Sequence, residues 1–199
     1  MDSRMDSVPG IVKDLASALI IVAVVLGVGY ALTGAWPFMV AVESGSMVPH
    51  LNIGDVVILV SPAKKHPVTW VEGKKIGYKS FGDYGDVIIY YPNGNRGVTP
   101  IIHRVIAWVN KGQPIVGINR TTGKLGELRY YHGMLIVTNR PVGKVVIAQS
   151  SGYITQGDHN PIPDEPELTQ PVKPNWILGV AVYRIPYVGY LRIIMQRLI

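Results

Sequence analysis

The segment "IIHRVIAWV", residues 101–109, is the strand pattern on which the fold prediction depends. Its residues are mostly β-branched or aromatic, and such side chains pack well on a half-buried pleated surface. Because successive side chains of a strand point to opposite faces, His103 shares a face with Val105 and Ala107. The sequence therefore predicts a strand that carries one histidine on an otherwise apolar face.

Similar runs recur along the chain, each bounded by Gly, Pro, Asn or Asp and with no helical pattern between them. The further predicted strands lie within residues 54–60, 85–91, 134–138, 143–149 and 175–185. Strands that follow one another in this way favour antiparallel pairing. We expect a mainly β fold, as a partly open barrel or a pair of packed sheets.

Two stretches interrupt the strand pattern. Residues 61–82 contain five lysines, and the longer stretch 110–150 begins with a part rich in Gly, Thr and Asn. We expect both to be insertions on the surface, either loops or lid-like subdomains.

The N-terminal region contains a long apolar run, "LASALIIVAVVLGVGYALT", residues 15–33, with no charged residue. At about 1.5 Å per residue, a helix of this length crosses the roughly 30 Å hydrocarbon core of a bilayer. We therefore expect a transmembrane helix over 15–36, preceded by a short tail over 1–14. A cleaved secretory signal peptide is the alternative, although its apolar region is usually only about 7–15 residues long.

Charges near the two ends of the chain bear on its orientation. The tail carries Arg4 and Lys13 against three acidic residues, a weak positive-inside signal that favours a cytoplasmic N-terminus. Residues 37–190 then form a domain outside the cytoplasm, on a single-pass protein of the cell membrane. The apolar and basic segment 186–199 is too short for a second span, and either lies on the membrane surface or packs against the domain.

Composition excludes several classes of site. The chain of 199 residues contains no cysteine, which rules out disulfides, cysteine zinc sites and a thiol nucleophile. Its net charge is +6, but the lysines and arginines are scattered and form no nucleic-acid motif. We expect no nucleic-acid partner, no cofactor and no metal. The basic surface either faces anionic lipid headgroups or has no specific partner.

A candidate nucleophile lies directly beyond the predicted membrane helix, in "SGSMVP", residues 44–49. Gly45 lets the backbone present Ser46 without steric hindrance. Ser, Gly and Pro are also the ordinary residues of turns, so a turn without chemistry is the simplest interpretation of this segment alone.

A serine hydroxyl becomes a good nucleophile only when a base removes its proton. Of the five histidines, only His103 lies in a strand pattern, which would give a base a fixed orientation; a purely structural histidine fits the same position. The other four, which we expect at the surface, are His50, His66, His132 and His159.

An acidic group that orients the base is available in "GDHNPIPD", residues 157–164, which supplies Asp158 and Asp164. The same segment also fits a solvated turn. Its spacing lacks the ladder of acidic residues that a calcium loop of the EF-hand type needs.

These segments, in their order, resemble the sequence boxes of type I signal peptidases. The boxes are "SGSMVP" (44–49), "GD" (54–55), "GDVIIYYP" (85–92), "IIHRV" (101–105) and "QGDHNPIPD" (156–164). The resemblance is to the archaeal and endoplasmic-reticulum variant, in which histidine stands where bacterial enzymes have lysine. It extends over roughly residues 10–190 and implies an N-terminal membrane anchor followed by an antiparallel β-domain of the signal peptidase type.

The resemblance also implies a role for each candidate residue. Ser46 matches the nucleophile, and Ser44, with the Ser46 backbone N–H, matches the oxyanion hole. His103 matches the general base. Asp158 and Asp164 match the acidic positions of the last box, and we favour Asp164 as the residue that orients the base.

The distances along the sequence depart from the family. Compact relatives have fewer residues between the nucleophile and the histidine, and between the histidine and the last box, than the 57 and 55 positions here. The roles of the two insertions are therefore left open.

The function that follows is a serine endopeptidase that removes signal peptides from secretory preproteins after small-x-small sites. Substrate would pair with a strand edge near Val40 and Val42, and the membrane lipid is the second expected partner. Whether translocation machinery or further subunits also bind is left open.

A serine autopeptidase of the repressor-cleaving kind is one alternative to this function. A membrane-anchored β-domain without activity is another, and it predicts that Ser46 and His103 lie far apart.

Overall fold

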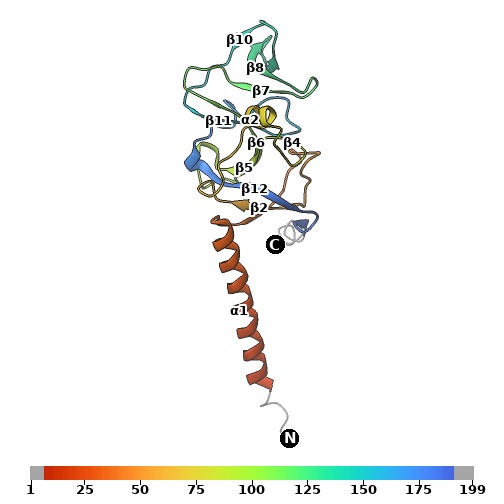
Figure 1. The fold of residues 1–199 in the computed structure, drawn as a ribbon, viewed down its shortest axis with the longest axis vertical. Helices are drawn as coiled ribbons and strands as arrows, with labels where there is room; N and C mark the ends of the chain where they lie inside the picture. Colours follow the sequence, from red (N-terminus) through yellow and green to blue (C-terminus); the bar gives the residue numbers. More distant parts are fainter. Residues whose placement is uncertain (1–6, 191–199) are drawn as a thin grey trace.

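In the computed structural model, which describes residues 7–190, one long N-terminal helix carries a mainly β body (Figure 1). The helices are α1 (Ser7–Thr33) and α2 (Trp70–Ile76), with 3₁₀ turns η1 (Pro92–Gly94) and η2 (Pro174–Trp176). The first strands are β1 (Met39–Ala41), β2 (Val56–Val60), β3 (Lys79–Ser80), β4 (Asp83–Tyr84), β5 (Val87–Tyr90) and β6 (Ile101–Val109). The remaining strands are β7 (Val116–Asn119), β8 (Lys124–Tyr131), β9 (Met134–Thr138), β10 (Lys144–Val145), β11 (Gly152–Gln156) and β12 (Ile177–Ile185).

Helix α1 is long and apolar enough over Gly10–Thr33 to cross a membrane, a property that it shares with secretory signal sequences. It ends three residues before the predicted boundary at residue 36, because Gly34 adopts a left-handed conformation with φ of 67°. The Gly34 N–H donates to the carbonyl of Tyr30 at 2.7 Å, which closes the last turn.

The main sheet contains six strands, and every pair in it is antiparallel, as the sequence predicts. Their order is β1-β2-β12-β5-β6-β11, so β1 and β11 are its edges. All four residues of β5 are buried, because the sheet is covered on both faces at this point. Val87 and Ile89 join one apolar cluster, while Ile88 and Tyr90 join another.

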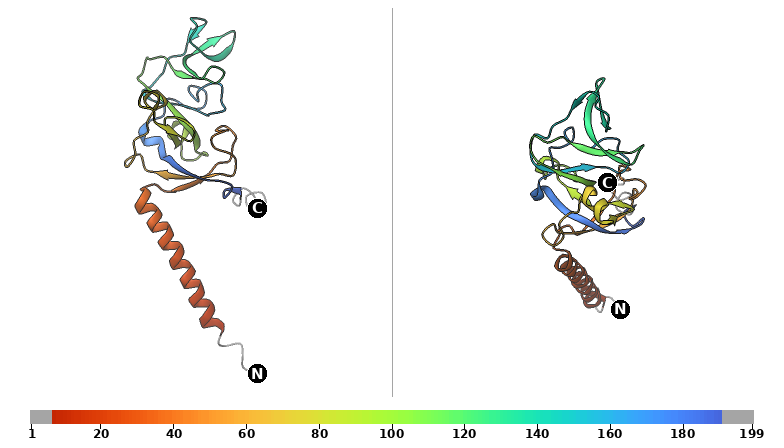
Figure 2. Two further views of the ribbon diagram at one scale, coloured as in Figure 1. Left: turned by 45° about the vertical axis from the view of Figure 1, so that its right-hand side comes forward. Right: turned by 45° about the horizontal axis from the view of Figure 1, so that its top comes forward.

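The insertion predicted over 110–150 forms a second antiparallel sheet of β7, β8, β9 and β10. Figure 2 shows this sheet at the end of the body that lies away from α1. It is packed on the main sheet through a shared cluster, in which Ile106 and Val109 of β6 contact the layer that contains Ile118 and Leu128.

The predicted strand bounds agree closely with the structure at β6 and β9 but not at β10. The run 143–149 was expected to be one strand, whereas only Lys144–Val145 pair with β8. Beyond them the chain turns to another partner, since Ile147 forms an isolated bridge with Pro114.

The insertion predicted over 61–82 contains α2 and β3, and β3 pairs with β4 directly beyond it to form a short hairpin. Thr69 and Glu72 form a capping box at the start of α2, and Gly77 ends it with φ of 75°. Trp70 anchors the helix by packing into the cluster under the second sheet. The described part of the chain is thus mainly β, with two larger antiparallel sheets and the β3–β4 hairpin behind one N-terminal apolar helix.

Candidate functional site

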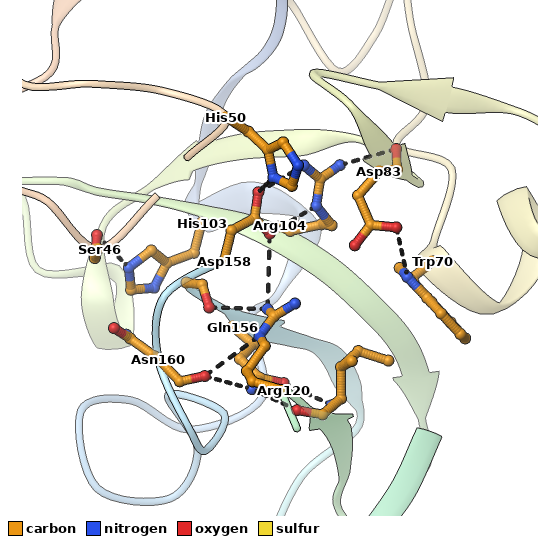
Figure 3. Close-up of polar contacts among 12 residues, drawn as sticks. Ser46, His50, Trp70, Asp83, His103, Arg104, Arg120, Gln156, Asp158 and Asn160 are labelled. Atoms are coloured by element: carbon orange, nitrogen blue, oxygen red, sulfur yellow. Dashed lines mark hydrogen bonds and ion pairs between the residues drawn. The ribbon is translucent and has the colours of Figure 1, made fainter. Parts of the chain in front are cut away.

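Three side chains from distant parts of the chain form a continuous set of hydrogen bonds. The Ser46 Oγ lies 2.9 Å from His103 Nε2 (Figure 3). On the other side of the ring, His103 Nδ1 lies 2.6 Å from Asp164 Oδ2. Ser46 belongs to the turn after β1, His103 to β6, and Asp164 to the loop after β11. His103 is only 4% exposed, so its ring orientation is fixed by the surrounding protein.

This arrangement is suited to removing a proton from the serine hydroxyl. When the Nδ1–H donates to the Asp164 carboxylate, Nε2 carries a lone pair that accepts the Ser46 proton. The carboxylate then stabilises the imidazolium that results. Of the two predicted aspartates, Asp164 is the one that contacts His103.

The turn that carries Ser46 is held by its backbone and by one buried side chain. Val48 N–H donates to Gly45 O at 3.1 Å, and Leu51 N–H donates to Met47 O at 3.0 Å. Met47 is buried in the apolar cluster beneath the main sheet. Ser46 is therefore fixed at the boundary between core and solvent.

The two groups predicted for the oxyanion hole belong to this turn. The Ser44 hydroxyl lies 3.2 Å from the Ser46 Oγ, on the exposed side. Within residues 7–190, the Ser46 backbone N–H donates no hydrogen bond. Both donors are thus close to the nucleophile.

The loop after β11 supports the backbone of Ser46. His159 N–H donates to Ser46 O at 2.8 Å. Gly157 lies so near that a Cβ atom there would be 2.7 Å from Ser46 O and 2.8 Å from Asn160 Nδ2. Only glycine fits at position 157 without displacing one of these groups.

Asp158, also predicted as a site residue, does not contact His103. It receives two hydrogen bonds from Arg104, from Nε at 2.8 Å and from Nη2 at 2.7 Å (Figure 3). Arg120 lies 3.6 Å away on the same carboxylate. Burial alone would raise the pKa of Asp158, but the bonds and charge of Arg104, helped by His50 and Arg120, outweigh it and lower that pKa.

The Arg104 guanidinium connects this aspartate to the β3–β4 hairpin. Its side chain is fully buried and donates to backbone carbonyls on that hairpin and its flanks. The acceptors are Ser80 O, Phe81 O, Asp83 O, Tyr84 O and Gly85 O, at 2.8–3.3 Å. Sequence reasoning did not find this role, because nothing local to Arg104 indicates which carbonyls surround it.

The surface position expected for His50 is wrong. His50 is half-buried, and its Nδ1–H donates to Asp158 Oδ2 at 2.8 Å. The turn from Met47 to Leu51 folds back onto the loop after β11, a contact between segments 108 residues apart that sequence patterns do not reveal. His66, His132 and His159 are exposed, as expected.

Asp164 has two further hydrogen-bond donors that the sequence did not identify. Tyr90 Oη donates to Asp164 Oδ2 at 2.8 Å, and Thr155 Oγ1 donates to the same oxygen at 2.7 Å. Burial and the charge of Asp164 raise the pKa of Tyr90, so the phenol remains a neutral donor. The available signal was the presence of polar side chains in strands that are otherwise apolar.

A cleft of about 720 Å³ opens beside the Ser46 hydroxyl. It is lined mainly by apolar side chains, among them Val40, Val42 and Ile101, together with Ser44 and His103. Strand β1, which forms one wall, is one of the two edge strands of the main sheet. Both predicted binding residues border the cleft. Val40 is half-buried and Val42 is buried.

No group of three or more His, Asp or Glu side chains suited to a metal ion is found in residues 7–190. Neither a scan against models of known protein families nor a search of curated proteins finds a match for this chain.

The close contact at Gly157 predicts the effect of one methyl group. Gly157→Ala should lower any activity of Ser46 by at least about tenfold, because the new Cβ displaces Ser46 O or Asn160. Reaction with a serine-directed phosphonate, measured by mass spectrometry, reports this loss. Gly123→Ala is the control for a Cβ without close contacts, since no atom lies within 4 Å of its position. Gly123 has a positive φ of 63°, whereas Gly157 does not, so any strain of the backbone falls on the control. Equal labelling of both variants would contradict the prediction.

The lowered pKa of Asp158 predicts how stability depends on acid. A carboxylate with a folded-state pKa below its ordinary 3.8 stabilises the fold above that pH, and the contribution is lost as the pH falls through the folded-state value. Asp158→Asn should therefore lower Tm most at neutral pH, with the difference from wild type shrinking below about pH 4. Thermal unfolding of both proteins from pH 7 to pH 3 measures this, with exposed Glu167→Gln as control. A difference that stays constant with pH would exclude the ionised pair.

Proposed function

We propose that this chain is a membrane-anchored serine endopeptidase of the type I signal peptidase kind, in the variant that uses a histidine base. The observation that carries the proposal is the hydrogen-bonded set of Ser46, His103 and Asp164 beside an apolar cleft. The order of the sequence boxes around these residues supports the same family.

In the proposed reaction, His103 Nε2 accepts the Ser46 proton while the Ser46 Oγ attacks the substrate carbonyl carbon. The Ser44 hydroxyl and Ser46 N–H stabilise the oxyanion, and each such donor typically contributes about 3 to 4 kcal/mol. His103 then gives its proton to the departing amine, which leaves an acyl group on Ser46. Water, deprotonated by the same histidine, attacks the ester and releases the second product.

The edge position of β1 suits an extended substrate. A peptide in β conformation adds to the outer side of Met39–Ala41 by backbone hydrogen bonds, with alternate side chains directed toward the cleft. Small residues of the substrate would enter the shallow spaces beside Val40 and Val42. Secretory preproteins with small-x-small sites are the proposed substrates.

The end of α1 is fixed to the body close to this edge. Lys64 Nζ donates to Ala31 O at 2.7 Å and to Leu32 O at 3.1 Å, and Ser61 N–H donates to Thr33 O at 2.9 Å. We propose that α1 spans the cell membrane with its N-terminus in the cytoplasm. The cleft then lies near the outer surface, where the apolar segment of a preprotein brings its cleavage site.

The two alternative functions, a β-domain without activity and an autopeptidase, require other features of the site. A β-domain without activity has no need of a serine hydroxyl 2.9 Å from a buried imidazole nitrogen. A repressor-type autopeptidase would cleave its own chain and would use a lysine base. The short distance favours an enzyme, and the histidine and apolar helix favour the signal peptidase.

Purified protein in detergent should cleave a preprotein after a small-x-small site. Ser46→Ala and His103→Ala should each lower kcat/KM by at least about 1000-fold, because each removes one half of the proton transfer. Ser151→Ala and His132→Ala, at exposed positions outside the cleft, serve as matched controls. Undiminished cleavage by either site variant would falsify the assignment, and cleavage of the chain itself in place of the preprotein would favour the autopeptidase.

The end of β12 supports the expectation of a membrane-surface segment over 186–199, of which residues 191–199 lie outside the described part. Tyr187 is 75% exposed, and Val188 beside it is also exposed. Figure 1 draws the end of β12 on the side of the body from which α1 emerges. Tyrosine favours the boundary between headgroups and hydrocarbon.

A nitroxide label at Tyr187→Cys should be more accessible to oxygen than to a water-soluble nickel complex in nanodiscs, because the label enters the lipid boundary. The chain contains no other cysteine, so each label is unique. Val22→Cys on α1 is the lipid control, and Met134→Cys at the far end of the body is the aqueous control. If the label at position 187 is as accessible to the nickel complex as the label at position 134, while the label at position 22 lies in lipid, the contact of residue 187 with the membrane surface is refuted. The proposal that α1 is the membrane anchor would stand.

A further inference from the structure

A second acidic side chain, Glu165, is buried directly behind the catalytic set. Its exposed fraction is 0%, and the exposed fraction of the neighbouring Asp164 is 2%. Within residues 7–190, no lysine, arginine or histidine lies within ion-pair distance of the Glu165 carboxyl group. A carboxylate in such a place would be a buried charge without a counterion.

The contacts of Glu165 converge on Thr155. Thr155 N–H lies 3.2 Å from Oε1 and 3.1 Å from Oε2 of Glu165. The Thr155 hydroxyl oxygen lies 3.0 Å from Glu165 Oε1 and 2.7 Å from Asp164 Oδ2. One threonine therefore bridges the two acids.

The number of available protons decides the charge of Glu165. A threonine hydroxyl has one proton to donate, and the shortest of its three contacts is with Asp164, while the longest, at 3.1 Å, is with Tyr90 Oη. Its contact with Glu165 is then between two oxygens and needs a proton from the glutamic acid. A protonated Glu165 satisfies both contacts, whereas an ionised one leaves two lone pairs facing each other.

Electrostatics favours the same state. Burial, followed by the charge of Asp164, raises the pKa of Glu165 well above its ordinary value. The titratable groups around this acid are Asp164 itself, Tyr90 from β5 and, beyond Asp164, His103 from β6. Of the two neighbouring acids, Asp164 is the one whose oxygen faces donors from three residues, since its Oδ2 faces Tyr90, Thr155 and His103.

We propose that Glu165 is a positioning residue that stays protonated and donates its O–H to Thr155, which in turn donates to Asp164. The arrangement leaves one negative charge behind His103 and fixes the carboxylate oxygen that orients the imidazole. A second charge would hold the imidazolium proton more tightly and hinder its transfer to the leaving amine. The role in positioning rests on the proposed peptidase function, while the protonation state does not.

The protonation state is tested by stability alone, on the full chain in detergent. If the folded protein keeps the Glu165 proton, the unfolded chain releases it above the ordinary pKa of 4.5, so wild type loses stability as pH rises from there toward the folded-state value. Glu165→Gln does not titrate. Its Tm relative to wild type should therefore increase with pH above about 4.5. A relative Tm that is constant or decreases would overturn the proposal, whether or not the protein is a peptidase.

The positioning role is tested by preprotein cleavage. Glu165→Gln keeps a neutral donor to Thr155 and should retain kcat within about threefold of wild type. Glu165→Met, of similar volume but without a donor, should lose about tenfold in kcat with KM unchanged, the equivalent of one neutral hydrogen bond. Both variants are assayed below their measured Tm. Wild-type kcat in Glu165→Met would overturn the positioning role, whereas absence of cleavage in wild type would reject the peptidase proposal instead.

Discussion

A buried ion pair between Arg104 and Asp158 is the interaction on which the site depends. The guanidinium is fully buried and is satisfied by one carboxylate and by backbone carbonyls of the β3–β4 hairpin. Removing either partner leaves a charge without compensation in the interior, which typically costs about 3 to 5 kcal/mol. The same pair holds the loop that reaches Ser46 through His159. The backbone of Ser46 is thus coupled to a charge pair behind it.

Two successive residues of strand β6 have different roles in the site. His103 and Arg104 point to opposite faces of the strand because side chains alternate. The loop after β11 then supplies one acid to each, Asp164 to the histidine and Asp158 to the arginine. One face of the strand carries the proton-transfer groups, and the other holds the framework that keeps them aligned. A shift of one residue in the pairing of β6 would exchange the two faces.

The sequence predicts those parts of this arrangement that have a local cause. Alternation and β-branched residues predict β6, and an uninterrupted apolar run predicts α1. Ser46, His103 and Asp164 were selected from residue type and order, and the structure brings them together. The contacts of Arg104, His50 and Glu165 were not predicted, because they join segments whose proximity no hydrophobic period or sequence spacing indicates.

The second sheet illustrates the same limit. Strands β9 and β10 lie within runs that were predicted as strands, and 110–150 was expected to be an insertion, but a separate sheet was not predicted. That separation follows from the left-handed turns at Gly123 and Gly133, and from the packing of Leu128 under β6. Such packing is decided by side chains that meet only after folding, so it cannot be read from one segment at a time.

The shared cluster of the second sheet has a consequence for any shortened version of the chain. Residues 110–150 interrupt the sequence between β6 and β11 and resemble a detachable insertion. Their apolar side chains nevertheless cover Ile106 and Val109, on the strand that carries His103. Truncation of the insertion would expose this end of β6 to water and loosen the histidine from a distance. Residues 110–150 thus help to hold strand β6 in place.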